Sequence, residues 1–142
     1  MKKTALMAWL TALVLACALG AQEEPQVEVL QLAKTTASWD GRALAAYPQG
    51  QPEITISRVV VPPGVKLPWH KHPVITAGVV LKGQLTVVTD QGERLHLKAG
   101  ESIVEVFQKW HQGSNDGDEP TEIVVFYAGV EGTPIVIPRD EQ

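Results

Sequence analysis

Three histidines are spaced so that their side chains can meet at one point. His70 and His72 are separated by one residue in a stretch that is typical of a β-strand, and His111 follows further along the chain. Side chains at positions i and i+2 of a strand point to the same face, so His70 and His72 converge while Lys71 points away. Neutral imidazole is a common ligand of transition metals. Two imidazoles on one face, together with a third, therefore predict a metal site.

Two polar residues close to these histidines have two interpretations each. Glu105 lies inside the apolar run Ile103–Phe107, where alternation favours an outward or rim position. An inward Glu105 would instead hydrogen-bond a ligand histidine or serve as a general base. Gln108, in the turn before His111, has the same alternatives. An inward carboxylate would favour an enzyme, because a positioned proton-transfer group separates an enzyme from a binding protein.

The alternation of side chains between the two faces of a strand, their parity, predicts where several other residues point. Thr76 shares parity with His72 and is expected to face inward, where its hydroxyl either holds a metal-bound water or fills space, with packing favoured. His96 lies between two leucines and is expected at the surface. Phe126 and Tyr127, in an apolar strand, are expected in the core.

The elements that must position these residues have the rhythm of β-structure throughout. Short runs rich in Val and Ile are separated by Gly, Pro, Asp and Asn. Strands are predicted at residues 27–32, 54–61, 69–72, 75–81, 84–89, 94–98, 102–107, 122–128 and 134–137. Thr36–Tyr47 is a weak candidate for a helical turn or an irregular loop. Strands this short and numerous predict an all-β, closed or sandwiched antiparallel barrel.

The first 21 residues have the form of a secretory signal peptide. Lys2 and Lys3 precede an apolar run that ends in small residues, which is too short to span a bilayer. Cleavage is expected after Gly20 or Ala21, giving a periplasmic or secreted protein without a stable membrane span. The stretch before Cys17 is similar to a bacterial lipobox, which would anchor the chain through a lipid on Cys17, but Leu15 fits that pattern poorly and simple secretion is favoured.

Removal of that segment would determine which metal ligands and which net charge the mature chain retains. Cys17 is the only cysteine, so no thiol would remain and a metal must use nitrogen and oxygen donors. Of the 12 Lys and Arg, all but Lys2 and Lys3 remain against 16 Asp and Glu, a net charge of −6 with no basic cluster. This excludes nucleic acid and anionic membrane surfaces as expected partners. The remaining residues suit one domain.

Two motifs in the chain resemble those of the cupin superfamily. Within it, the chain is similar to the small single-domain type-2 cupins, which form a jelly-roll β-barrel. In the first motif Gly64, His70, His72 and Gly83 are in register, with Thr76 where the family has a glutamate. In the second, Gly100, His111 and Asn115 fit, while Val106 and Gln108 replace a proline and a glycine. Segments such as SWDG, HKHP and FYAG are similar to a group of small exported bacterial cupins.

The resemblance implies one divalent transition metal, Fe, Mn, Ni, Cu or Zn, held by His70, His72 and His111. Without the glutamate, three neutral ligands would leave the ion its full charge of +2 and favour a small anionic ligand. The expected function is an exported metal-binding cupin, either a metal-dependent enzyme acting on a small anionic substrate or a non-enzymatic periplasmic protein that binds a small ligand or metal. Edge strands favour a homodimer.

The expected domain layout follows from these segments. Residues 1–21 form the signal peptide, residues 22–53 an amino-terminal strand and loop segment of the barrel, residues 54–138 the barrel core, and residues 139–142 a carboxy-terminal tail. There is no room for a second domain.

Overall fold

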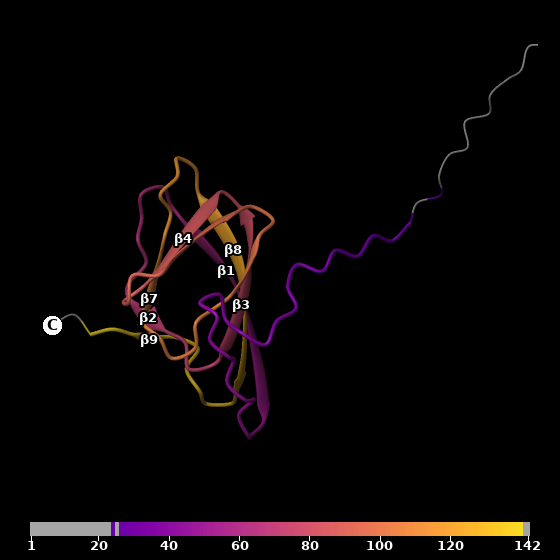
Figure 1. The fold of residues 1–142 in the computed structure, drawn as a ribbon, viewed down its shortest axis with the longest axis vertical. Coiled ribbons are helices and arrows are strands. Elements are labelled where there is room, and N and C mark those ends of the chain that lie inside the picture. Colours follow the sequence, from indigo (N-terminus) through magenta and orange to yellow (C-terminus); the bar gives the residue numbers. More distant parts are fainter. Residues whose placement is uncertain (1–23, 25, 141–142) are drawn as a thin grey trace, which may run out of the picture.

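The computed structural model describes Glu24 and residues 26–140, and the chain forms a β-barrel (Figure 1). The predicted signal peptide, including Cys17, lies outside the described residues. The strands are β1 (Pro52–Val61), β2 (His70–Lys71), β3 (Ile75–Lys82), β4 (Gln84–Thr89), β5 (Arg94–Lys98), β6 (Ser102–Val104), β7 (His111–Ser114), β8 (Thr121–Val130) and β9 (Ile137–Pro138). The described residues contain no helix, so the all-β prediction is confirmed.

Two antiparallel sheets form the barrel. One has the strand order β1-β8-β3-β6 and the other the order β5-β4-β7-β2-β9. The longest pairing joins β1 to β8 along ten residues, from Pro52 opposite Val130 to Val61 opposite Thr121. The core lies between the sheets and consists of inward-facing aliphatic side chains and one tyrosine: Val74, Val80, Leu85, Val87, Leu97, Ile103, Ile123, Val125 and Tyr127.

The predicted strands differ from the structure at several places, and the strand predicted at residues 102–107 already ends at Val104, as β6. Val27–Leu32 forms no strand, and its apolar side chains are exposed. The last predicted strand, at residues 134–137, is found instead as β9 at Ile137–Pro138. Strand β7 was not predicted, because HQGS has neither apolar alternation nor β-branched residues. The weak helical candidate at Thr36–Tyr47 is an irregular loop with one bridge, between Ala37 and Ala43.

Several residues of the two predicted motifs lie in turns of the barrel and stabilise them. Gly64, Gly83 and Gly100 all have positive φ. At Gly83, φ is 72° and a Cβ would lie 2.9 Å from the Pro120 carbonyl oxygen, so only glycine fits between β3 and β4. Asn115 is fully buried, and its amide donates to the Val61 and Glu119 carbonyls. These residues therefore fix turns between strands of the barrel: Gly83 joins β3 to β4, Gly100 joins β5 to β6, and Asn115 follows β7.

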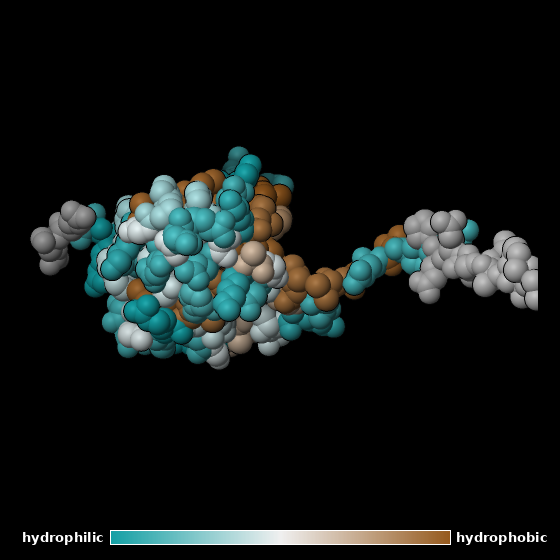
Figure 2. Space-filling model, turned by 90° about the horizontal axis from the view of Figure 1, so that it is seen from above, coloured by the Kyte–Doolittle hydropathy of each residue, from teal (hydrophilic) through white to brown (hydrophobic). Residues whose placement is uncertain are grey.

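The outer face of β1 and β8 carries exposed apolar side chains beside the ion pair of Arg58 with Glu122. Ile56 lies opposite Phe126 across the two strands, and both are exposed, so the prediction of a core position for Phe126 is wrong. Ile54 and Val60 extend the same face, and Figure 2 shows apolar residues gathered on the side of the barrel where the amino-terminal segment leaves it. The homodimer stays a prediction, which the mass of the protein measured by sedimentation would check.

Within residues 26–140 and Glu24, we find no helix that is both long enough and apolar enough to cross a bilayer.

Candidate metal centre

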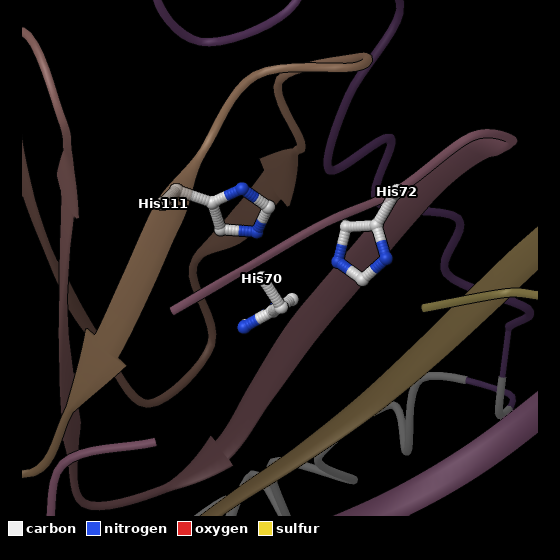
Figure 3. Close-up of side chains that lie close together, drawn as sticks. All are labelled: His70, His72 and His111. Carbon is white, nitrogen blue, oxygen red and sulfur yellow. The ribbon is translucent and has the colours of Figure 1, made fainter. Parts of the chain in front are cut away.

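The three histidines come together from two neighbouring strands. His70 in β2 lies opposite His111 in β7, and directly opposed residues of an antiparallel pair share a face. His72 follows β2 by one residue, so it joins the same face. Figure 3 shows the three rings facing a common space. The ring centroids are 4.4–5.0 Å apart, and one nitrogen from each ring lies within 4.8 Å of the others.

Backbone carbonyls fix the tautomer of every ring. Nδ1 of His70 lies 2.8 Å from the Pro68 carbonyl oxygen, that of His72 lies 2.7 Å from Ile135, and that of His111 lies 2.9 Å from Lys109. A carbonyl oxygen only accepts hydrogen bonds, so each Nδ1 must carry the proton and donate it. Nε2 of each ring is left with a free lone pair. This is the tautomer that a metal-binding histidine needs.

Burial keeps these rings neutral. It lowers the pKa of His72 to about 4 and also lowers the pKa values of His70 and His111. The hydrogen bonds to the backbone carbonyls act in the opposite direction and do not restore the ordinary values. Neutral imidazoles at neutral pH can coordinate an ion without first losing a proton.

Glu105 points into the barrel, so the favoured prediction of an outward or rim position is wrong. The residue is 9% exposed, and its Oε2 lies 3.7 Å from Nε2 of His111. Burial raises the pKa of Glu105 to about 7, against a smaller lowering influence from His70. With the pKa of His111 lowered and that of Glu105 raised, the two groups do not form an ion pair at neutral pH. The structure therefore has Glu105 in the inward orientation.

The other two residues predicted near the site take part differently. Thr76 is buried, as parity predicted, and its hydroxyl donates to the Val74 carbonyl at 3.2 Å, which is the packing role. Gln108 is exposed and does not line the cavity described below. It contacts the site through its backbone N–H, which donates to the His72 carbonyl, and it has a φ of 54°. His96 is exposed, as expected.

A cavity of about 280 Å³ opens in front of the histidines. This is close to the lower bound of roughly 300 Å³ for small-molecule pockets. Apart from the three histidines, Glu105 and Tyr127, its walls are formed by apolar side chains and Gly113: Val59, Val61, Leu67, Pro68, Leu85, Val87, Ile123, Val125, Val136 and Pro138. None of the residues described as lining it is a lysine or an arginine. An anion in this cavity would meet no fixed cationic side chain.

Sequence reasoning missed two contributions to the site. Tyr127, expected only in the core, lines the cavity with its ring 5.5 Å from that of His72. Lys109, whose carbonyl holds His111, has a buried ammonium group 3.0 Å from Asp40 Oδ2 and 2.5 Å from Glu93 Oε2. These ion pairs tie the loop at residues 38–42 to the segment that leads into His111. No local sequence signal joins positions so far apart.

The barrel is similar to those of several solved enzymes. Oxalate oxidase in complex with the substrate analogue glycolate is 26% identical, with a TM-score of 0.50 over 59% of this chain and 45% of the enzyme. A polyketide cyclase, RemF from Streptomyces resistomycificus, is 20% identical with a TM-score of 0.54, covering 66% of this chain and 64% of the cyclase. The DMSP lyase DddQ from Ruegeria pomeroyi is 21% identical with a TM-score of 0.53, covering 62% and 45%.

These comparisons support the predicted jelly-roll barrel, and the last two, at their level of identity, concern the fold alone. The chain spans less than half the length of oxalate oxidase and of the lyase. No curated protein matches the sequence. The family model for the cupin domain, Cupin_2, matches residues 57–127, which is half of the sequence and includes all three histidines. The chain therefore belongs to the cupin family, in its type-2 form.

Proposed function

We propose that this protein is an exported metal-dependent cupin in which His70, His72 and His111 hold one divalent transition ion, Fe, Mn, Ni, Cu or Zn. The observation that carries the proposal is the set of three Nδ1 hydrogen bonds to backbone carbonyls. They leave a free lone pair on Nε2 of each ring, and one ligand nitrogen of each ring lies within 4.8 Å of the others. Imidazole suits several of these ions equally well, so the donor set leaves the choice among them open.

Elemental analysis of the protein purified from its native exported compartment tests this proposal. We expect about one metal ion per chain, because three convergent imidazoles supply the three ligands on one face of a single ion. His72→Ala should lose most of the metal while the barrel stays folded, and the exposed His96→Ala should keep it. The measured mass should also correspond to a chain that begins after Gly20 or Ala21. Equal metal content in wild type and His72→Ala would exclude this site, and an uncleaved mass would exclude the predicted processing.

The ligand that we propose for the centre is a small carboxylate. The cavity has apolar walls and no cationic side chain among its described lining residues, so a bound metal ion would be the positive charge that attracts an anion. Oxalate oxidase, similar to this chain, has been solved with glycolate. The cavity volume suits a molecule of that size. A bound metal would act as a Lewis acid toward a coordinated carboxylate oxygen.

Titration of the metal-loaded protein with glycolate and with oxalate separates an enzyme from a binding protein. We expect both anions to bind and His111→Ala to abolish binding, because the ion is their positive partner. Consumption of either anion at a rate above that of the free metal would establish an enzyme. Saturable binding without consumption would instead support the alternative, a non-enzymatic periplasmic protein that binds a small ligand. An uncharged analogue that binds equally well would argue against anion recognition.

A further inference from the structure

Two buried acceptor atoms face each other in the site without any donor between them. Nε2 of His111 has a free lone pair because Nδ1 carries the proton, and Oε2 of Glu105 is a carboxyl oxygen. Among the described residues neither atom has a hydrogen-bond partner, and both are inaccessible to solvent. Buried polar atoms in native structures almost always have partners, so this pair requires an explanation.

The distance between the two atoms fits a shared cation better than a shared proton. At 3.7 Å they are too far apart for a hydrogen bond from a protonated Glu105 to His111. Metal–ligand bonds of about 2.0–2.2 Å separate two ligand atoms on one ion by about 3.0–3.5 Å at tetrahedral or octahedral angles. A small rotation of either side chain would bring the atoms to that spacing.

The backbone explains how Glu105 reaches this point. Ala77 in β3 pairs with Val104 in β6, and the N–H of Glu105 donates to the Thr76 carbonyl at 2.9 Å. Glu105 is thus the cross-strand neighbour of Thr76. Both side chains are buried, whereas the Thr76 hydroxyl is already bonded to Val74. A carboxylate at position 105 therefore enters the barrel one strand away from position 76, and from the same side.

We propose that Glu105 is the fourth protein ligand of the metal centre, supplied from the segment between β6 and β7 in place of a carboxylate at position 76. This inference rests on the proposed three-histidine site and adds one ligand to it. One anionic ligand changes the charge of the occupied centre from the expected +2 to +1. The ion then keeps fewer open positions for a carboxylate ligand than three histidines alone would leave.

Metal affinity of the full mature chain, measured by competition with a chromogenic chelator for Zn²⁺, tests the proposal. Glu105→Gln keeps the shape of the side chain and is expected to weaken Zn²⁺ binding about 10- to 100-fold, on the scale at which groups around a metal act. Glu131→Gln, in the exposed turn after β8, is the matched control and should bind as wild type does. The double variant Thr76→Glu/Glu105→Thr should recover most of the affinity, because it returns a carboxylate to the neighbouring position.

The absorption spectrum of the Co²⁺-loaded protein distinguishes a ligand from a positioning residue. Loss of a ligand in Glu105→Gln should shift the visible bands and change their intensity. Unchanged bands, or unchanged Zn²⁺ affinity, would overturn the proposal even if the double variant fails to fold. His72→Ala tests the underlying site independently. If His72→Ala binds Zn²⁺ as wild type does, the three-histidine centre is wrong. If Glu105→Gln leaves the Zn²⁺ affinity and the Co²⁺ spectrum unchanged while His72→Ala loses Zn²⁺ binding, the three-histidine centre is correct and Glu105 is not a ligand.

Discussion

Metal binding is expected to raise the free energy of unfolding of the metal-free protein by about 4 kcal/mol when the free ion is present at roughly 1,000 times its dissociation constant. The ligands belong to β2, its flanking residue and β7, and they converge only in the folded barrel. An ion that binds the folded chain and not the unfolded one shifts the equilibrium by this amount. Chemical denaturation with and without added Zn²⁺, at constant pH, measures the difference.

His111→Ala should remove most of this gain in stability. The residue supplies the most enclosed of the three ligands, being 2% exposed, and two histidines bind an ion more weakly than three. His96→Ala, on the surface of β5, should keep the full metal-dependent gain. An equal gain in wild type and His111→Ala would mean that the ion binds elsewhere.

The second large effect concerns Glu105 in the metal-free protein. Its folded pKa of about 7 exceeds the value near 4.5 expected in the unfolded chain. Between these values the folded state holds a proton that the unfolded state releases, so the group makes stability fall as pH rises from about 4.5 to about 7. Glu105→Gln removes the carboxylate. With a chelator present, the variant should exceed wild type in free energy of unfolding by about 3 kcal/mol at pH 8 and match it below pH 4.5.

The comparison reports on Glu105 together with the groups that its charge influences. Glu105 is not a cause of the lowered pKa values of His72 and His111, so the contributions of these two rings cancel in the difference. The Glu105 charge raises the pKa values of His70 and Tyr127, so these couplings are part of the measured difference. Glu131→Gln, in the exposed turn after β8, is the matched control. A constant offset between Glu105→Gln and wild type from pH 4.5 to pH 8 would contradict the burial of an ionising Glu105.

The convergence of the histidines could be predicted because it depends on local geometry. The i, i+2 spacing of His70 and His72 places both on one face whatever the rest of the barrel does, and the structure has them there. Gly64, Gly83 and Gly100 lie between predicted strands, and in the structure all three have the positive φ that glycine adopts without strain. These features need only a few consecutive residues to determine them.

The direction of Glu105 could not be predicted in this way. All four of its nearest neighbours are apolar, so alternation gives no sign of which parity faces the core. Ile103, Glu105 and Val106 are all buried, because β6 ends at Val104 and the alternation ends with it. The strand predicted at Val27–Leu32 is absent for another reason, which is the lack of a pairing partner. Its composition suits a strand, but no strand in the described chain pairs with it.

The hydrogen bond from His72 to Ile135 makes the centre depend on the end of the chain. The two residues are 63 positions apart, and β9 pairs with the strand that carries His70. During synthesis the amino terminus emerges first, so residues 135–138 are the last part of the barrel to appear. Only then can the Ile135 carbonyl accept the hydrogen bond that holds the His72 ring in its Nδ1–H tautomer. A metal ion bound by His72 would therefore meet a complete centre only after the whole barrel has been synthesised.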